Sequence, residues 1–205
     1  GASPGKIAMI RAHGARCVVV DGTRDHCAQV CRERVHEGGA YYASHVYDPF
    51  FYEGTKTYIY EVYERMGRIP ENVFLPLGNG TLFIGVMQGL IHLLDSGCIR
   101  KMPRVFAVQS ERCAPILEAV RRGMSRPAEI TPQATLAEGI AIGRPMRGEE
   151  ILSLIARYDV CVVGAPEEGI IPARERLLRR GISSEHTSAA IYAAYTALVE
   201  GGARL

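Results

Sequence analysis

The chain has almost no excess of either charge. Its 24 lysine and arginine residues face 22 aspartate and glutamate residues, which gives a formal net charge of +2 over 205 residues. The basic residues are dispersed along the sequence and form no stripe. Because binding to nucleic acids depends on clustered positive charge, we expect no nucleic-acid partner.

Long apolar runs are also absent. The longest, such as Thr81–Val86 and Ile191–Val199, are much shorter than the ~20 residues that cross a bilayer. No basic segment followed by an apolar one opens the sequence, so we expect a cytoplasmic protein without a membrane segment. Hydrophobic residues make up 47% and charged residues 22%, which is typical of a folded globular chain and excludes disorder.

The six cysteines lack the dense spacing of a secreted disulfide framework. Most lie in apolar or helical surroundings, as Cys17 does before three valines, so we expect reduced and mostly buried thiols. Cys27 and Cys31, with His26 and His36 on adjacent turns of one predicted helix, could offer two soft ligands to zinc. Without a second paired cluster, the pattern favours a structural helix and no metal site.

Strand-like runs alternate with helix-like segments along nearly the whole sequence. This order is typical of an α/β fold with an open parallel sheet flanked by helices. The predicted strands are Arg16–Val20, Ala40–Ser44, Asn72–Leu77, Arg104–Val108 and Asp159–Val163. Residues 82–94 and 189–199 are apolar almost all round, which predicts interior helices.

Helix boundaries carry recognisable signals. Pro4, next to Ser3, opens the first predicted helix, Thr23 caps the second, and Pro115 lies in the first turn of the helix after Val108. The acidic pairs 149–150 and 167–168 begin helices, where negative charge favours the positive end of the dipole, so capping is a better interpretation than acid–base catalysis. Four arginines between 174 and 180 share a helix with Glu175 and indicate a solvated face.

The composition changes around residues 47–51, where Pro49 and several aromatic residues cluster before a helix predicted to begin near Glu53. We therefore expect two domains, residues 1–48 and residues 49–205. Residues 123–148 contain three prolines and little periodicity, and long irregular stretches of this kind usually serve function.

The strongest chemical signal is the segment Val73–Leu82, a buried strand that runs through a glycine-containing loop into an apolar helix. Glycines let the backbone approach an anion, and the unpaired N–H groups of Gly80, Thr81 and Leu82 would point at it. Thr81 adds a hydroxyl donor. The pattern is typical of a phosphate site, although a tight turn without a ligand explains these residues equally well.

Two named phosphate motifs do not fit this segment. A Walker A loop requires glycine and lysine after four residues, and a dinucleotide fingerprint requires a third glycine where Phe83 stands. The longer sequence context provides the discriminating information. Five segments lie in a characteristic order and spacing: Asp48–Thr57, Gly78–Thr81, Pro103–Gln109, Thr135–Ile142 and Glu185–Ala190.

Taken together, these segments resemble the threonine synthase branch of fold-type-II pyridoxal-phosphate enzymes. The resemblance implies that the cofactor is pyridoxal 5′-phosphate (PLP) and that residues Gly78, Asn79, Gly80, Thr81 and Leu82 hold its phosphate. It also implies that Thr135–Ile142 runs close to the cofactor ring, that residues 1–48 are part of a small cofactor-covering domain, and that residues 49–205 are most of the large domain.

The activity that this resemblance implies is a PLP-dependent lyase reaction on an amino-acid substrate. Threonine synthases convert O-phosphohomoserine to threonine and phosphate, and their relatives eliminate ammonia or exchange β-substituents. The cofactor acts as an electron sink while the protein supplies orientation and charge. We also expect a homo-oligomer, in the form of a dimer.

The sequence departs from the family pattern at the catalytic lysine. The lysine motif, the serine-glycine-asparagine loop and the threonine-glycine motif do not occur in it. Its lysines, Lys6, Lys56 and Lys101, stand at non-catalytic family positions and are predicted to be surface charges. His186 stands where the family commonly has proline, either touching substrate or simply solvated at a helix start.

From these departures we expect a fragment of a larger enzyme that binds the cofactor weakly and turns nothing over. Exposed apolar faces should then cause self-association. The alternative is a non-catalytic α/β module, or a subunit of a split enzyme, that binds phosphate or a partner chain.

Overall fold

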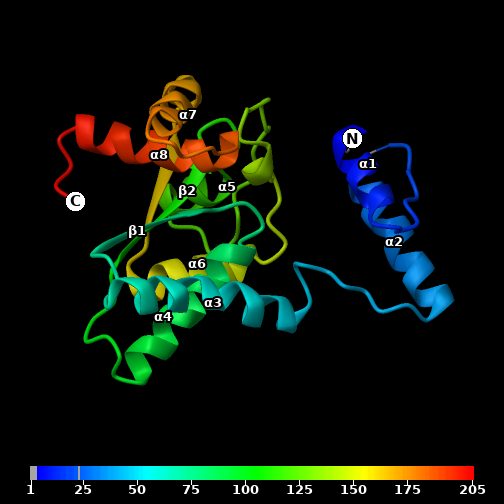
Figure 1. Ribbon diagram of the computed structural model, residues 1–205, viewed down its shortest axis with the longest axis horizontal. Coiled ribbons are helices and arrows are strands. Elements are labelled where there is room, and N and C mark those ends of the chain that lie inside the picture. Colours follow the sequence, from blue (N-terminus) through cyan, green and yellow to red (C-terminus); the bar gives the residue numbers. More distant parts are fainter. Residues whose placement is uncertain (1–3, 23) are drawn as a thin grey trace. The chain divides into compact units, whose positions relative to one another are not determined.

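The computed structural model describes residues 4–22 and 24–205 and divides the chain into two compact units, Gly1–Ser44 and His45–Leu205 (Figure 1). The division falls slightly before the predicted boundary at residues 48 and 49. Across the described ranges, no helix is long and apolar enough to span a bilayer.

The first unit contains two helices, α1 (Pro4–Ala12) and α2 (Arg24–Gly38). The predicted strands Arg16–Val20 and Ala40–Ser44 are wrong, because both segments are irregular in the structure. A strand requires a neighbour that takes up its backbone hydrogen bonds, and the described part of this unit contains none. The predicted capping residues Ser3 and Thr23 lie outside the described residues.

The second unit is built on a parallel sheet with strand order β1-β2-β3. Its strands are β1 (Asn72–Pro76), β2 (Arg104–Ser110) and β3 (Cys161–Ala165), which confirms the other three predicted strands within two residues at every end. Phe74 pairs with Phe106, and Phe106 pairs with Cys161. The open parallel sheet confirms the α/β class.

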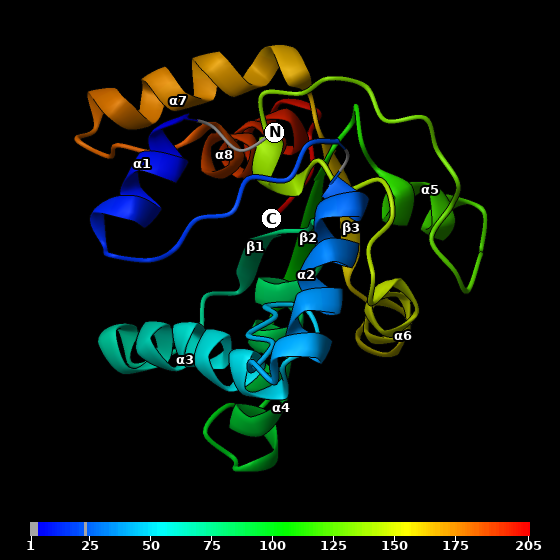
Figure 2. The same cartoon turned by 90° about the vertical axis from the view of Figure 1, so that its right-hand side faces the viewer.

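Helices cover both faces of this sheet. The helices of the unit are α3 (Pro49–Met66), α4 (Thr81–Asp95), α5 (Pro115–Arg121), α6 (Gly148–Tyr158), α7 (Ile170–Arg179) and α8 (His186–Glu200), with short 3-10 turns η1 (Glu138–Ile140) and η2 (Glu167–Gly169). Both views place α7 and α8 on one side of the sheet and α3, α4 and α6 on the other (Figures 1 and 2).

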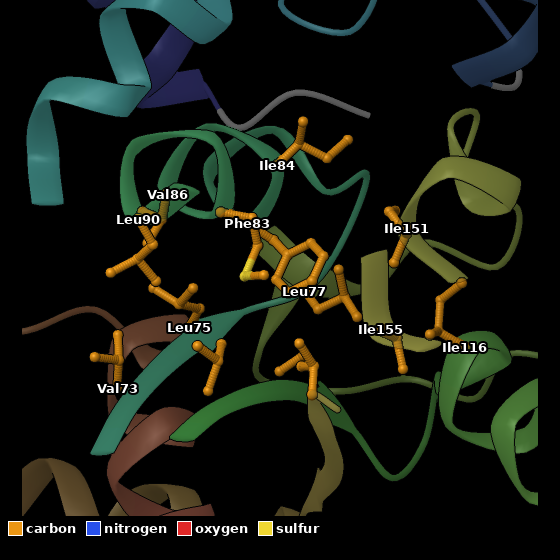
Figure 3. Close-up of a cluster of buried hydrophobic side chains, with 14 of the residues drawn as sticks. Val73, Leu75, Leu77, Phe83, Ile84, Val86, Leu90, Ile116, Ile151 and Ile155 are labelled. Atoms are coloured by element: carbon orange, nitrogen blue, oxygen red, sulfur yellow. The ribbon is translucent and has the colours of Figure 1, made fainter. Parts of the chain in front are cut away.

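The larger core lies between the sheet and α4. Phe83, Ile84 and Leu90 of α4 are fully buried, and Phe83 and Leu90 lie on the side of α4 that faces Leu75 and Leu77 (Figure 3). This confirms the predicted interior helix. The prediction for α8 holds for one face only, because Ala189, Ala190, Ala193 and Ala194 are buried, whereas Ala197 is exposed and Val199 is 45% exposed.

Helix α3 begins earlier than predicted, at Pro49 rather than near Glu53. Proline suits the first helical position because its missing N–H has no helical acceptor there. The Asp48 side chain caps the helix by accepting a hydrogen bond from Phe50 N at 2.9 Å.

Close contact between α3 and α4 holds the start of α4 in place. A Cβ atom built on Gly85 would lie 2.1 Å from Thr55 Oγ1, and one on Gly89 would lie 2.4 Å from Ile59 Cγ2. Only glycine allows this approach. Thr55 Oγ1 also donates a hydrogen bond to Thr81 O at 3.3 Å. The backbone at the first residue of α4 is therefore fixed by α3.

Two predictions about exposure are wrong. Lys56 is buried, because its stem packs along α4 while its ammonium group pairs with Glu53; Lys6 and Lys101 are exposed as predicted. All six cysteines, each within the described ranges, are free as predicted, but Cys113 is the buried one and Cys27, Cys31 and Cys98 are exposed.

Candidate functional site

The turn between β1 and α4 has a backbone that requires glycine at Gly80. This residue is the N-cap of α4 and has φ +86°, in the left-handed region. A Cβ atom at this position would lie 2.5 Å from Ile151 Cδ1 on α6. Any other residue would therefore strain the backbone and collide with α6.

Unpaired donors accumulate in this turn. Among the described residues, none of the backbone N–H groups from Gly78 to Phe83 has a protein acceptor, and the first helical bond runs from Ile84 N to Gly80 O at 2.8 Å. Gly80 brings no side chain that could cap them. A 15-residue helix adds the positive end of its dipole at the same place. This arrangement fits an anionic group such as a phosphate.

The Thr81 side chain has a partner of its own. Its Oγ1 donates a hydrogen bond to His45 O at 3.2 Å, while Thr81 O accepts from Thr55. The Thr81 hydroxyl, which the sequence analysis predicted as a phosphate donor, thus also binds the backbone of residue 45 to the turn. A phosphate at the turn would meet backbone donors first.

The turn lies directly against the segment Thr135–Ile142. A Cβ atom built on Gly78 would lie 3.1 Å from Gly139 O and 3.2 Å from Ile140 Cα. Gly139 N in turn donates a hydrogen bond to Thr187 Oγ1 at 3.1 Å, at the start of α8. The structure therefore brings together three segments that are distant in the sequence, 78–82, 135–142 and 185–190.

Glu167 holds the middle segment at this position, a role that the sequence did not reveal. Its carboxylate accepts hydrogen bonds from Thr135 Oγ1 at 2.6 Å and from Leu136 N at 2.7 Å. Ser110 Oγ donates to Thr135 Oγ1 at 2.9 Å, and Arg112 lies 3.8 Å from the Glu167 carboxylate. The sequence could have indicated this role, because Glu167 follows the predicted strand that became β3, and ligands of parallel sheets bind at the carboxyl ends of the strands.

Arg147 carries a permanent positive charge close to the turn. Its guanidinium group lies 4.7 Å from the centre of the Tyr52 ring and pairs with Glu150. Burial alone would lower the pKa of Arg147, but the hydrogen bond to Tyr52 and the Glu150 carboxylate outweigh it and raise that pKa. Arg147 O accepts from Ile151 N, the residue that packs on Gly80.

Nucleophiles and metal ligands do not gather at this edge of the sheet. Burial raises the pKa of the Cys113 thiol, which keeps it protonated. Lys56 directs its ammonium group to Glu53, and Lys101 precedes β2, at the opposite end of the strands from Gly78. Residues 4–22 and 24–205 contain no group of three metal-ligating side chains.

The remaining candidates behave as surface residues. His186 begins α8 and is half-buried, and the arginines of α7 are exposed as predicted. Glu149 and Glu150 lie in the first turn of α6, which confirms their predicted place at a helix start.

Several protein families combine an open parallel sheet with a glycine turn that can bind an anion. Comparison with known proteins identifies the family of this chain. The chain belongs to the family of pyridoxal-phosphate dependent enzymes, whose model matches residues 1–203. The cofactor of the family is therefore pyridoxal phosphate, and the fold-type-II resemblance is confirmed.

Threonine synthases are among the curated proteins that this chain is similar to. The enzyme of Methanosarcina acetivorans is 29% identical over 203 residues, covering 97% of this chain and 49% of that protein. The enzyme of Methanocaldococcus jannaschii is 28% identical with the same coverage. The chain spans about half the length of the curated relatives it matches.

A solved structure supports the fold. The processed form of threonine deaminase isoform 2 from Solanum lycopersicum superposes with a TM-score of 0.82 at 22% identity, covering 98% of this chain and 53% of that one. At this identity the likeness concerns the architecture alone.

Proposed function

We propose that this chain supplies the phosphate-holding part of a PLP-dependent lyase of the threonine synthase type. The single observation that carries the proposal is the run of unpaired N–H donors from Gly78 to Phe83, set in a glycine turn at the start of α4. Gly78, Asn79, Gly80, Thr81 and Leu82 would hold the 5′-phosphate. The threonine synthase relatives, similar over 97% of the chain, support this assignment.

The proposed reaction is replacement or elimination at the β or γ carbon of an amino acid, with O-phosphohomoserine converted to threonine and phosphate. When bound, the cofactor supplies an electron sink for negative charge that develops on the substrate. The chain's own contribution is orientation. The turn fixes one end of the cofactor, and Glu167 and Thr135 hold residues 135–142 against Gly78.

None of the three lysines is proposed to join the cofactor covalently, because all three stand at non-catalytic positions of the family pattern. In addition, Lys56 pairs with Glu53, and Lys101 lies at the other end of the strands. We therefore expect PLP to bind reversibly to the 205-residue chain without turnover. The test is a titration with PLP followed by borohydride reduction and mass spectrometry. An absorbance band that dialysis removes, with no reduced adduct, supports the proposal. A stable adduct on Lys6, Lys56 or Lys101 contradicts it.

The second candidate function is a non-catalytic phosphate- or partner-binding module. It is favoured by the position of Lys56, whose ammonium group pairs with Glu53 and not with a group at the turn. Adding a lysine-bearing segment of a threonine synthase in trans separates the two. Restored lyase activity supports a part of an enzyme, whereas reversible PLP binding without any rescue supports a binding module.

We further propose a cytoplasmic location, a small amino-acid substrate and self-association into a homodimer. Exposed aromatic side chains on the second unit support association, since Phe50 is 77% and Tyr58 is 50% exposed. Sedimentation at high protein concentration tests this. A strictly monomeric species would count against it.

A further inference from the structure

Gln109 is a fully buried polar residue in an otherwise apolar part of β2. A buried amide is costly unless its donors and acceptor are paired. In this strand every neighbour toward the amino end, from Val105 to Val108, is buried and apolar. The amide therefore has to find its partners beyond the strand.

Its partners are backbone groups from two different connections. Gln109 Oε1 accepts hydrogen bonds from Ile116 N at 2.9 Å and from Leu117 N at 3.0 Å, in the first turn of α5. Gln109 Nε2 donates to Leu77 O at 3.3 Å. One side chain thus caps α5, whose own N-cap residue Ala114 makes no side-chain bond, and binds the last carbonyl before the glycine turn.

The bond to Leu77 O sets the direction of the turn. Leu77 N donates to Val108 O at 2.8 Å, so the residue is held on both sides. The peptide between Leu77 and Gly78 is planar and trans, so its N–H points away from its C=O. When Gln109 fixes Leu77 O, the N–H of Gly78 is fixed in the opposite direction, away from Gln109. This N–H is the first of the unpaired donors.

We propose that Gln109 is the positioning residue of the phosphate turn: its amide donor orients the Leu77–Gly78 peptide, while its carbonyl oxygen occupies the donors of α5. The proposal rests on the proposed function, since it assigns a role in PLP binding. The role is indirect, because Gln109 touches the backbone of the turn and not the cofactor. Because Gln109 occupies the N–H donors at the start of α5, the start of α4 is the anion site of these two neighbouring helices.

The discriminating variant is Gln109→Glu, which keeps an acceptor for Ile116 N and Leu117 N but loses the donor to Leu77 O. Gln109→Met removes both the acceptor and the donor, and it provides a second variant in case Gln109→Glu does not fold. Val105→Ala is the matched control, because it weakens the core of the same strand at the far end from the turn. Each is made in the 205-residue chain and titrated with PLP and with pyridoxal, which lacks the phosphate.

We expect Gln109→Glu and Gln109→Met to raise the Kd for PLP about tenfold and to change the Kd for pyridoxal by less than about twofold. Val105→Ala should lower the Tm and leave the ratio of the two Kd values as in the wild type. The role of Gln109 is overturned if its variants raise the Kd for PLP and the Kd for pyridoxal by the same factor. It is also overturned if Val105→Ala changes the ratio of the two Kd values as much as the Gln109 variants do. If the wild type itself binds PLP no better than pyridoxal, the proposed function fails, and this inference fails with it.

Discussion

Helices α4 and α5 both begin at the carboxyl edge of the same parallel sheet, yet their first turns differ. In α5 the N–H groups of Ile116 and Leu117 are occupied by the Gln109 side chain. At the start of α4 and in the turn before it, the N–H groups from Gly78 to Phe83 have no protein acceptor within the described residues. Both helices start after a parallel strand, but of the two only α4 keeps its first donors without a protein acceptor in the described part of the chain.

We propose that this difference makes the start of α4, and not that of α5, the anion site. A side-chain acceptor nearby satisfies the donors internally, as in α5. A glycine N-cap with positive φ removes that acceptor and lets the backbone come close to a ligand, as in α4. The neighbouring contacts of Gly78 with Gly139 then add a wall to the site.

The largest effect is expected from Gly80→Ala, which destroys the α4 turn. The new methyl group would meet Ile151 at 2.5 Å on a backbone with φ +86°, and this strain and overpacking cost about 1–3 kcal/mol. We expect the Kd for PLP to rise at least about tenfold in a fluorescence titration.

Gly97→Ala is the matched control for Gly80→Ala. Gly97 also has positive φ, +74°, but a Cβ atom there meets nothing within 4 Å. Its Tm should fall while PLP binding stays unchanged. Equal loss of PLP binding in both variants would show that strain, and not the geometry of the turn, is responsible.

Glu167→Gln should weaken the wall beside the turn. Thr135 Oγ1 and Leu136 N donate to different carboxylate oxygens, Oε2 and Oε1, and the amide replaces one of these acceptors with an NH2 donor, so residues 135–142 lose one of two anchors. Because a hydrogen bond to a charged group contributes about 1.5–3 kcal/mol, we expect a lower Tm and a Kd for PLP raised several-fold. Calorimetry of unfolding and of binding measures both. Glu168→Gln is the matched control, because Glu168 is the next residue and is exposed, and it should change neither the Tm nor the Kd for PLP.

A carboxylate placed beside each helix start compares the two directly. Asn79→Asp replaces a neutral amide with a negatively charged carboxylate next to unpaired donors. It should stabilise the chain by about 0.5–1 kcal/mol at low salt while weakening PLP binding. Ala114→Asp adds one where Gln109 already occupies the donors, so its stabilisation should be smaller. Urea unfolding measures both variants. A larger gain at Ala114 would contradict the idea that the α5 donors are occupied.

The smallest effect concerns Cys113, just before α5. A thiol at a free helix start usually has a lowered pKa, but burial raises the pKa of Cys113. The native chain at pH 8 should therefore react with iodoacetamide at the exposed Cys98 and spare Cys113. Peptide mass spectrometry follows the modification. Alkylation of Cys113 as fast as that of Cys98 would show that the start of α5 is open.

Local patterns predicted much of the second unit. Alternation and apolar runs located the three strands, and the apolar segment 82–94 became the buried helix α4. Pro115 stands at the first turn of α5 as expected. These features depend on near neighbours in the sequence, which is why they can be read from it. The family was also recognisable from five segments in order.

The missed features depend on partners far along the chain. Gln109 bonds to Leu77, 32 residues away, and Glu167 bonds to Thr135 at the same separation. Lys56 was expected at the surface, but α4 covers its stem. The strands expected near residues 16–20 and 40–44 have strand-like composition without a neighbouring strand to pair with in the described unit. Composition alone does not reveal such partners.

The central claim is that backbone donors at the start of α4 hold the phosphate of PLP. The most direct measurement is the ratio of the Kd for pyridoxal to the Kd for PLP in the 205-residue chain, at fixed ionic strength. The account predicts a ratio of at least about ten, with inorganic phosphate competing for PLP and not for pyridoxal. A ratio near one, unaffected by phosphate, would contradict it.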